Sequence, residues 1–578
     1  MRGAQWAGVL VCGLTLAALA PWLSGHLFLA FIGEQGNPGP LTIIDYWRAY
    51  RAFPGYTLEL YGAILAPWAI PAAALAAAIF RPKPPTLYGG AHFASEGELR
   101  RAGLRADSGL LLGKKAGRFL CASGQMGALV FAPPRSGKGV GFGIPNLLNW
   151  PGSALVTDVK LENYDVTSGF RAEHGQAVYV FSPVDQEGRT HRYNPLDFVA
   201  PAGGRRIDDI QKLTFKLMPM PPRADPMWTN EARDLLEGVL LYLLDIEPPA
   251  TIGAALRLVR SIPDFNEWIA TQFTAHEAAL DPHARLSFTG FLQKSAKEQS
   301  GVLSSLKGAL ALWSNPLVDA ATSATDFDPG ALRRRPMTIY LGIGPADIGR
   351  LAPLVNVFLQ QTFDALLRKM PGDDEPHQVL ALLDEFTALG RLENVEKGIA
   401  YFAGYGVCLA PIIQDLPQLR QVYGIDAEKV FLSTARYRIA YAQNNDDTAS
   451  YISRQLGFTT IKTHTSSRRV GLKGDNWTKN VSAGLARREL MLPHEVMQLP
   501  RHQAIVLVEG AAPVLADKIV YYKDKAFRDR LRPAIALPVV PPAPTAAPVV
   551  SIPERPAAPA LSAEDIDAVL REASGQDR

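Results

Sequence analysis

The sequence predicts an α/β protein: a doubly wound sheet of mainly parallel strands, an inserted all-helical segment and two apolar helices at the N-terminus. Short apolar runs recur along the chain, separated by segments of helical periodicity. Such runs are typical of strands that are buried on both faces of a parallel sheet. The eight expected strands lie in ALVFAP (128–133), SALVTDV (153–159), AVYVFSP (177–183), MTIYLGIG (337–344), QVLALLDEF (378–386), GVCLAPIIQ (406–414), RYRIAYA (436–442) and QAIVLVEG (503–510).

The first element along the chain is expected to be a membrane anchor. No Asp, Glu, Lys or Arg occurs from Gly3 to Gly33, and Leu60 to Phe80 is a second uncharged run. Each run reaches the roughly 20 residues that a helix needs to cross ~30 Å of hydrocarbon. The prediction is a transmembrane anchor over residues 1–84, with spans at about 5–31 and 60–80 and a short periplasmic loop at 34–58.

A cleaved signal peptide is the alternative for the first run, because Ala18-Leu19-Ala20 resembles a cleavage site. Pro21 and the long apolar continuation argue against cleavage. Basic residues flank the two runs on their outer ends, which places the N-terminus and the large C-terminal body in the cytoplasm. These flanking residues are Arg2, Arg81 and Lys83.

Composition sets limits on the rest of the chain. The formal net charge of +3 is close to neutral, so any nucleic-acid binding must come from local basic patches. Three widely spaced cysteines do not form the pattern of a disulfide framework. The expected domains are a nucleotide-binding domain in two parts (85–205 and 332–530), an all-helical insertion (206–331) and a tail (531–578).

The tail is predicted to be disordered because it is rich in proline and alanine. It ends in SAEDIDAVLREA, where Ser562 and Asp565 predict a capping box for a short C-terminal helix. The two interpretations of this end are a frayed tail and a docking helix for a partner.

A phosphate-binding loop is predicted after the strand that ends at Phe131. Small residues let the backbone close around a phosphate, with the N-terminus of a following helix behind it. Lys138 would reach the β- and γ-phosphates as a point charge. The residues expected to bind the nucleotide are Pro134, Arg135, Ser136, Gly137, Lys138, Gly139 and Val140.

Two positions depart from the usual G-x-x-x-x-G-K-[ST] pattern. Ala132 stands in place of the first Gly, and Gly139 stands where a Ser or Thr would hold magnesium. The loop alone therefore leaves open a degenerate, inactive site.

A pair of carboxylates strengthens the prediction of a nucleotide site. The apolar strand expected at 379–383 ends in Asp384 and Glu385. A carboxylate at the C-terminal edge of a parallel strand can hold magnesium, so Asp384 is the expected metal ligand. Glu385 is placed to orient or deprotonate an attacking water. The expected ligands are ATP and Mg²⁺, with Lys138 and Glu385 as catalytic residues.

Other polar residues also follow predicted strands at this edge. Gln414 is a further candidate catalytic residue, as a sensor of the γ-phosphate, and equally a surface Gln that opens a helix. Asp158 and Lys160 lie at the end of another strand, where isolated charges are usually solvated.

Several motifs, taken in order, resemble the TraG-like coupling proteins of type IV secretion and bacterial conjugation, an FtsK-related P-loop family. The likeness covers roughly residues 1–525. Two N-terminal apolar runs are followed by PPRSGKGVG, TDVKLENYDVTSGFR, RYNPL, WTNEARDLLEGVLLYL, LLDEFTALGRL and IIQDLPQLRQVYG.

This resemblance implies a RecA-like P-loop NTPase domain with an all-α insertion, assembled as a homo-hexamer at the bacterial inner membrane. It implies that ATP hydrolysis drives a relaxase–single-stranded DNA complex into a secretion channel, whose proteins would be partners. The implied phosphate-loop lysine, metal and catalytic acids and sensor are Lys138, Asp384, Glu385 and Gln414. Candidates for an arginine finger are Arg391, Arg420 and Arg436.

A basic segment from Lys462 to Arg488 is the candidate for DNA contact. It contains seven basic residues against one acid, and Trp477 lies among them. Phosphate neutralisation and base stacking use this combination. The alternative is a mobile, solvated loop, which its Gly, Ser and Thr content favours. The candidate contacts are Arg468, Arg469, Lys473 and Lys479.

The main alternative function is a motor with the same ATPase core that secretes an effector protein. We find no [NT]-K-x-D motif of a GTPase and no LSGGQ-like signature of a transporter ATPase. The Glu beside Asp384 favours hydrolysis over the phosphoryl transfer of a kinase. An inactive membrane scaffold is a further hypothesis, because Ala132 and Gly139 depart from the usual phosphate-loop pattern.

Overall fold

The computed structural model of the protein divides into two units, Met1–Leu87 and Tyr88–Arg578. The structure describes residues 2–79, 86–124, 127–220, 226–468 and 479–542.

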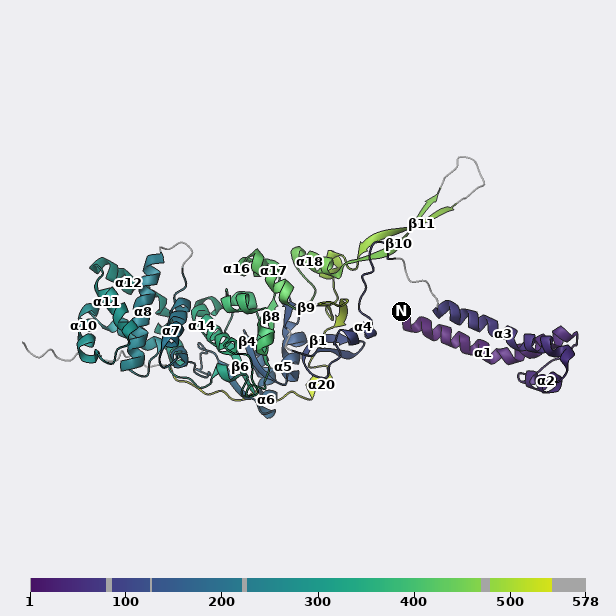
Figure 1. The fold of residues 1–578 in the computed structure, drawn as a ribbon, viewed down its shortest axis with the longest axis horizontal. Coiled ribbons are helices and arrows are strands. Elements are labelled where there is room, and N and C mark those ends of the chain that lie inside the picture. Colours follow the sequence, from purple (N-terminus) through teal and green to yellow (C-terminus); the bar gives the residue numbers. More distant parts are fainter. Residues whose placement is uncertain (1, 80–85, 125–126, 221–225, 469–478, 543–578) are drawn as a thin grey trace, which may run out of the picture. The chain divides into compact units, whose positions relative to one another are not determined.

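The smaller unit is a pair of long helices joined by short ones. Helices α1 (Arg2–Ile32) and α3 (Thr57–Ile79) lie side by side (Figure 1). Between them in the chain come α2 (Thr42–Tyr50) and η1 (Pro54–Tyr56). The small core of this unit contains Phe28, Ile43, Leu60 and Ala63.

The structure forms helices over the two predicted spans, as far as it describes them. Within the described residues, however, no helix combines the length and the apolar character that crossing a membrane requires. The transmembrane prediction for 5–31 and 60–80 is therefore not confirmed. The stretch 34–58, predicted as a loop, contains the short helices α2 and η1.

The larger unit is built on a sheet that has eleven strands within its described residues. Strands from β9 to β5 run parallel, and the four at the other end pair antiparallel. In order across the sheet, the strands are β2 (Arg118–Ala122), β1 (Leu110–Lys115), β13 (Val514–Asp517), β12 (Gln503–Val508), β9 (Tyr437–Ala440), β3 (Ala128–Phe131), β8 (Val407–Ile413), β7 (Val379–Leu383), β4 (Ser153–Asp158), β6 (Met337–Gly342) and β5 (Ala177–Phe181). All eight predicted strands are present.

The central strands are buried on both faces, as a doubly wound sheet requires. On β7, Val379 and Leu383 belong to one hydrophobic core, whereas Leu380 and Leu382 belong to the other. The connecting helices are α4 (Glu96–Arg101), α5 (Ile144–Asn149), α6 (Glu162–Glu173), α14 (Ile348–Leu367), α15 (Glu393–Gly398), α16 (Leu416–Tyr423), α17 (Ile425–Thr434), α18 (Asp446–Leu456), α19 (Pro493–Met497) and α20 (Lys525–Arg528). Short turns of helix are η3 (Pro195–Phe198), η5 (Pro329–Ala331), η6 (Phe386–Leu389) and η7 (Phe402–Tyr405).

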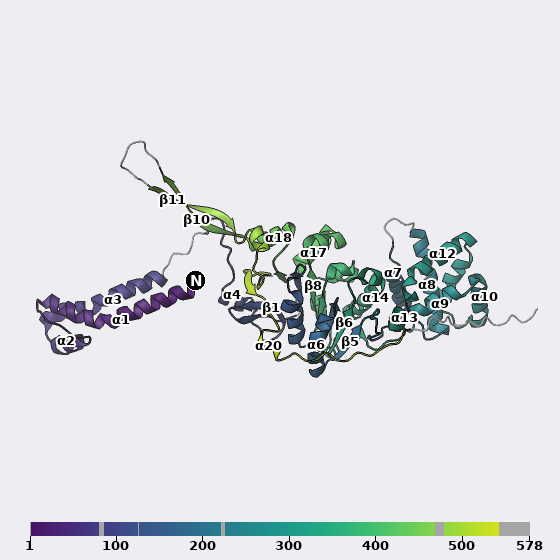
Figure 2. The same cartoon turned by 180° about the vertical axis from the view of Figure 1, so that it is seen from behind.

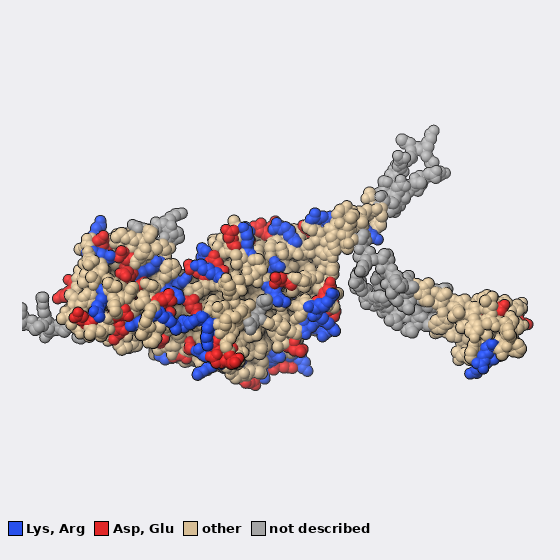
Figure 3. Space-filling model, in the orientation of Figure 1, with Lys and Arg blue, Asp and Glu red and all other residues tan. Residues whose placement is uncertain are grey.

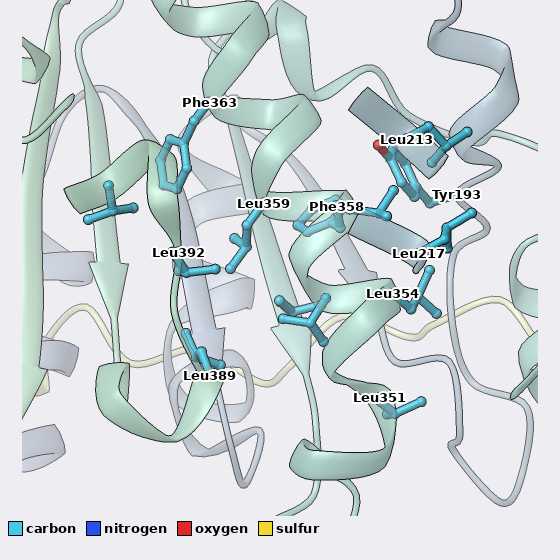
Figure 4. Close-up of a cluster of buried hydrophobic side chains, with 14 of the residues drawn as sticks. Tyr193, Leu213, Leu217, Leu351, Leu354, Phe358, Leu359, Phe363, Leu389 and Leu392 are labelled. Carbon is cyan, nitrogen blue, oxygen red and sulfur yellow. The ribbon is translucent and has the colours of Figure 1, made fainter. Parts of the chain in front are cut away.

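Between β5 and β6 the described residues form helices and no strand, as the helical periodicity predicts. Helix α7 packs on α14 and on α8, and so connects this segment to the sheet (Figures 1 and 2). Figure 4 shows the junction, where Leu213 and Leu217 of α7 lie near Leu354 and Phe358 of α14. The helices are α7 (Gly204–Leu217), α8 (Pro226–Ile246), α9 (Ile252–Ser261), α10 (Phe265–His276), α11 (Pro282–Leu292), α12 (Ala296–Ala309), η4 (Ala311–Ser314) and α13 (Pro316–Ala321).

The two described ends of the basic segment proposed for DNA contact are paired strands, and residues 469–478 between them lie outside the described residues. Strands β10 (Phe458–Arg468) and β11 (Lys479–Glu489) pair antiparallel and project from the larger unit beside α18 (Figure 1). The base of the hairpin bonds to the start of the unit, because Ala91 N–H donates to the carbonyl oxygen of Phe458 at 3.0 Å.

The segment 531–542, predicted as the start of a disordered tail, packs against the larger unit. The Val540 N–H donates to the carbonyl oxygen of Gly188 at 2.8 Å, and Arg532 pairs with Glu173 of α6 at 2.6 Å. A Cβ on Gly169 would lie 2.0 Å from the carbonyl oxygen of Pro533, so only glycine admits this chain path. Residues 543–578, including the predicted capping box, lie outside the described residues.

Candidate nucleotide site

The predicted phosphate loop leaves the sheet at the end of β3 and leads into a helix. A π-helical turn, η2 (Gly139–Gly143), continues directly into α5. Arg135 and Gly137 adopt the left-handed conformation, with φ of +60° and +81°. Residues of alternating hand turn successive N–H groups toward one side, which forms a concave anion site. The backbone therefore has the shape that a phosphate requires.

One side chain of the loop, that of Ser136, also suits an anion. The Ser136 hydroxyl is buried and has no hydrogen-bond partner among the described residues. A buried hydroxyl without a partner is costly, so a ligand oxygen would stabilise it. A Cβ on Gly139 would meet no atom within 4 Å. The surroundings of Gly139 would therefore have room for the Ser or Thr that the usual pattern has at this position.

The lysine of the loop meets the two acids although 246 positions separate Lys138 from Asp384. The Lys138 ammonium lies 2.6 Å from a carboxylate oxygen of Asp384 and also pairs with Glu385. Strand β3 carries the loop, and β7, two strands away, carries the acids. Because parallel strands end at the same edge, the sheet brings these groups together, as the sequence predicts.

Gln414 joins the same cluster from the end of β8, which lies between β3 and β7. Its amide donates to the second carboxylate oxygen of Glu385 at 2.9 Å, and Gln418 in turn donates to Gln414 at 3.1 Å. Glu385 itself adopts a left-handed conformation with φ of +49°. Its carboxylate is therefore held from two sides by Lys138 and Gln414.

The cluster is partly buried, and this shifts its titration. Burial raises the pKa of Asp384, and the charge of Lys138 offsets part of that rise. Burial also acts to raise the pKa of Glu385, but hydrogen bonds from Lys138 and Gln414 outweigh it and lower that pKa. Glu385 is therefore held as a carboxylate at neutral pH, the form that can accept a proton.

Asp158, expected to be solvated, is buried at the end of β4, whereas Lys160 is exposed. The Asp158 carboxylate accepts the backbone N–H of Tyr164 at 2.8 Å, near the start of α6. Burial raises the pKa of Asp158 to about 6, and the nearby charge of Asp384 also raises it. No pattern in the sequence predicts that this carboxylate is buried. A missed contact beside it is the Thr157 hydroxyl, which donates to the Asp384 carbonyl oxygen at 2.9 Å.

We expect Asp158→Asn to raise the thermal stability of the protein at pH 7.5 but not at pH 4. The ordinary Asp pKa is about 3.9, so the folded state binds the extra proton between about pH 4 and 6. Stability is thus lost as pH rises through this window, and Asn avoids the loss. Thermal unfolding at the two pH values measures the effect. A lower melting temperature for Asp158→Asn at pH 7.5 would contradict it.

Other candidates lie away from this cluster. Arg391 pairs with Glu396, and Arg420 pairs with Glu428. Arg436 lines a separate cavity of about 200 Å³ together with Glu509. None of the three arginines has a described contact with Lys138 or the two acids.

Of the DNA candidates, Arg468 and Lys479 are register partners at the outer end of the described hairpin, and Arg469 and Lys473 lie outside the described residues.

A second group of ligand-type side chains lies in the helical segment. Asp234 and Glu237 of α8 and His283 of α11 have ligand atoms within 4.8 Å of one another. His283 hydrogen-bonds to Glu237 at 2.8 Å, Thr214 donates to Glu237 at 3.1 Å, and Ser287 donates to Asp234 at 3.0 Å. These bonds connect α7, α8 and α11.

A phosphate loop after one strand and an acid pair after another, on one doubly wound sheet, define a P-loop nucleotide-binding protein with a helical insertion. The family model for type IV secretory system conjugative DNA transfer matches residues 92–539. The chain belongs to this family and is a coupling protein of type IV secretion and conjugative DNA transfer. The resemblance seen in the sequence is confirmed.

Two curated relatives agree with this assignment. The chain is 35% identical to Protein VirD4 of Agrobacterium fabrum (strain C58 / ATCC 33970) over 454 residues, or 76% of this chain and 67% of that protein. It is 31% identical to the conjugal transfer protein TraG of Escherichia coli, over 71% of this chain and 69% of that protein. These matches therefore span about two thirds of each relative.

Solved structures of the coupling protein TrwB share the fold. One, described as the plasmid coupling protein TrwB in complex with ADP and Mg²⁺, has a TM-score of 0.55 at 16% identity. It aligns with 79% of this chain and 99% of its own. The unbound form described as TrwBdeltaN70 gives the same TM-score, over 79% of this chain and all of its own. The α/β architecture with a mostly parallel sheet is therefore shared.

Proposed function

We propose that the larger unit hydrolyses ATP with Mg²⁺ at the cluster formed by Lys138, Asp384, Glu385 and Gln414. The observation that carries this proposal is the direct contact of Lys138 with both acids at the edge of the sheet. The buried, unpartnered Ser136 hydroxyl and the left-handed residues of the loop fit a phosphate. The protein TrwB, which shares this fold, has a solved structure in complex with ADP and Mg²⁺, and this supports the choice of ligands.

Each residue then has a stated role. Lys138, which neutralises the two acids, binds the β- and γ-phosphates when a triphosphate enters. When Lys138 moves from the two acids to the phosphates, both carboxylates become free. Asp384 is then the candidate magnesium ligand, and Glu385 is the base that takes a proton from the attacking water. Gln414 holds the Glu385 carboxylate by its 2.9 Å hydrogen bond and is placed to respond to the γ-phosphate. Magnesium, when bound, neutralises charge on the phosphates.

The proposed cargo is a relaxase–single-stranded DNA complex, which the chain would drive into the secretion channel. Family membership supports this choice, and the hairpin β10–β11 supplies basic residues on a projecting element. Over the face drawn in Figure 3, basic and acidic side chains are mixed on the larger unit, so a local element suits DNA better than a whole face. A secreted effector protein with no DNA is the second candidate, since the ATPase core would be the same.

The proposed location is the bacterial inner membrane, with the larger unit in the cytoplasm as part of a homo-hexamer. The resemblance to the family supports this, together with the exposed apolar side chains of the N-terminal unit. Large exposed hydrophobic residues there include Leu19, Trp22, Leu23, Phe31, Leu58, Leu65 and Trp68.

The test is the ATPase activity of the purified full chain, with and without single-stranded DNA at low salt. A DNA motor is expected to hydrolyse ATP several-fold faster in the presence of DNA, because bound DNA would shift the protein toward the conformation that hydrolyses ATP. An ATPase rate that is the same with and without DNA would instead favour the effector-protein motor. No hydrolysis under either condition would contradict the ATPase itself.

The double variant Arg468→Ser with Lys479→Ser is expected to weaken DNA binding. Each lost phosphate contact lowers the salt slope of single-strand binding by about 0.7, so the slope should fall by about 1.4. Fluorescence anisotropy of labelled single-stranded DNA at several salt concentrations measures it. The matched control is Lys397→Ser with Lys429→Ser, which removes two exposed charges from helices α15 and α17. Equal slopes for the two variants would exclude the hairpin as the DNA contact.

A further inference from the structure

Lys518 reaches the phosphate loop from the antiparallel end of the sheet. It directly follows β13, and its backbone N–H donates to the carbonyl oxygen of His502 at 2.7 Å. Its side chain extends to the loop, where the ammonium donates to the carbonyl oxygen of Ser136 at 3.0 Å. Although 382 positions separate Ser136 from Lys518, the two are joined directly.

The ammonium of Lys518 lies in an unusual environment for a cation. Its nitrogen is 3.6 Å from the centre of the Tyr441 ring, and Tyr441 is buried. No carboxylate within the described residues forms an ion pair with it. Burial lowers the pKa of Lys518 to about 8. A cation with a carbonyl and a ring as partners, but no anion, is costly to bury, so a nearby anion would stabilise it.

The geometry of the peptide group gives this contact a consequence for the nucleotide. A trans peptide is planar, and its C=O and N–H point in opposite directions. Lys518 binds the carbonyl of the Ser136–Gly137 peptide, so the Gly137 N–H of that same peptide is directed away from Lys518. Gly137 is left-handed, and Lys138 follows it in the loop. An N–H held in this way is pre-organised for a phosphate oxygen.

We propose that Lys518 is a positioning residue of the nucleotide site, which fixes the Ser136–Gly137 peptide so that the Gly137 N–H is presented to a nucleotide phosphate. This inference rests on the ATP binding proposed above. The phosphates supply, one peptide away, the negative charge that the surroundings of Lys518 lack. Lys518 does not touch the nucleotide in this arrangement and acts through the loop.

Tyr441 extends the same support to the helix behind the loop. A Cβ on Gly141 of η2 would lie 2.8 Å from the Tyr441 hydroxyl oxygen, so the ring packs closely against this turn. The Tyr441 N–H also donates to the carbonyl oxygen of Phe131 at 3.0 Å. The loop is therefore braced by Lys518 and Tyr441, on the side opposite to the acids of β7 in the order of strands.

Among the groups around the loop, Lys518 is the candidate for a change of charge between pH 7 and 9.5. Burial raises the pKa of Tyr441 above its ordinary value, so the phenol stays neutral in this range. Lys138 is occupied by Asp384 and Glu385. Of the charged residues in the loop and on β13, Arg135 and Asp517 are exposed.

The experiment compares the full-length wild type with Lys518→Met and Lys518→Arg by measuring the Kd of a non-hydrolysable ATP analogue from pH 7 to 9.5. Methionine keeps much of the apolar stem but removes the charge, whereas arginine keeps the charge at every pH used. We expect Lys518→Met to bind about tenfold more weakly at pH 7, in line with one lost charged hydrogen bond. Wild-type binding should weaken as pH rises through about 8, and Lys518→Arg should bind well at both ends.

Each outcome decides the matter. Binding by Lys518→Met equal to wild type at pH 7 would overturn the proposal, and so would the same pH-dependent weakening in Lys518→Arg as in wild type. Thermal unfolding of the empty proteins separates a folding defect from a binding defect, and Lys518→Arg provides a folded comparison if methionine destabilises the chain. If wild type itself binds no analogue, the ATP proposal fails rather than the role of Lys518.

Discussion

Glu385→Gln is expected to reduce ATP hydrolysis by about 10²-fold or more, while ATP binding stays close to that of wild type. A positioned general base contributes about 10²–10⁴ in rate, and the amide cannot take a proton from water. Gln has nearly the same shape as Glu, and Lys138 remains available for the phosphates. Hydrolysis and DNA transfer should therefore fall together, because transfer is proposed to depend on hydrolysis.

The measurements are the steady-state ATPase rate, the Kd of an ATP analogue and a conjugative transfer assay on the same proteins. Glu187→Gln is the matched control, since this Glu is exposed and pairs only with the neighbouring Arg189 in the described structure. Normal hydrolysis by Glu385→Gln would remove Glu385 from the mechanism. Loss of both hydrolysis and binding would show that Glu385 shapes the site rather than the reaction.

Much of the sheet and of the cluster could be predicted from the sequence, because both follow from burial. Strands that are buried on both faces consist of continuous apolar residues, and β3, β7 and β8 show this pattern. Polar residues directly after such strands must lie at one edge of a parallel sheet. This rule predicts that Lys138, Glu385 and Gln414 lie together.

Elements at the rim of the sheet were missed for the opposite reason. Strands β1 and β2 contain exposed or half-buried basic residues at Lys115 and Arg118, and β10 is almost wholly polar. Their pairing is set by neighbouring strands and not by a local apolar pattern. Lys518 was missed too, since a single lysine after a four-residue strand carries no signal in the sequence. Only the antiparallel pairing of β13 with β12 brings it near the loop.

The segment 531–542 shows how a pattern can mislead in the other direction. Proline-rich composition predicts disorder when no partner surface is considered. Here the surface belongs to the same chain: Gly169 and Gly188 leave room for the carbonyl oxygens of Pro533 and Val540. The missing side chains of two glycines, far away in the sequence, decide the path of this segment.

Lys138→Ala is expected to weaken ATP binding by about 10²-fold and to abolish measurable hydrolysis. Lysine–phosphate hydrogen bonds are charge-assisted, and about 3 kcal/mol of lost binding corresponds to this factor. The empty protein changes as well, since Asp384 and Glu385 lose the cation that lies between them. The pKa of Glu385 should rise, because the hydrogen bond and charge of Lys138 contribute to its lowered value. Calorimetric titration with an ATP analogue and the ATPase rate measure the two effects.

Lys160→Ala is the control that separates contact from general electrostatics. Lys160 also lies near the acids and lowers the pKa of Glu385, but its side chain is 69% exposed and makes no described contact with them. Its loss should change binding and hydrolysis only slightly, because solvent screens an exposed charge. If Lys138→Ala supported transfer as well as wild type, Ala132 and Gly139 would mark a degenerate loop, and the inactive scaffold would account for the chain. If both lysine variants lost binding equally, net positive charge at the edge would matter, and not the 2.6 Å contact between Lys138 and Asp384.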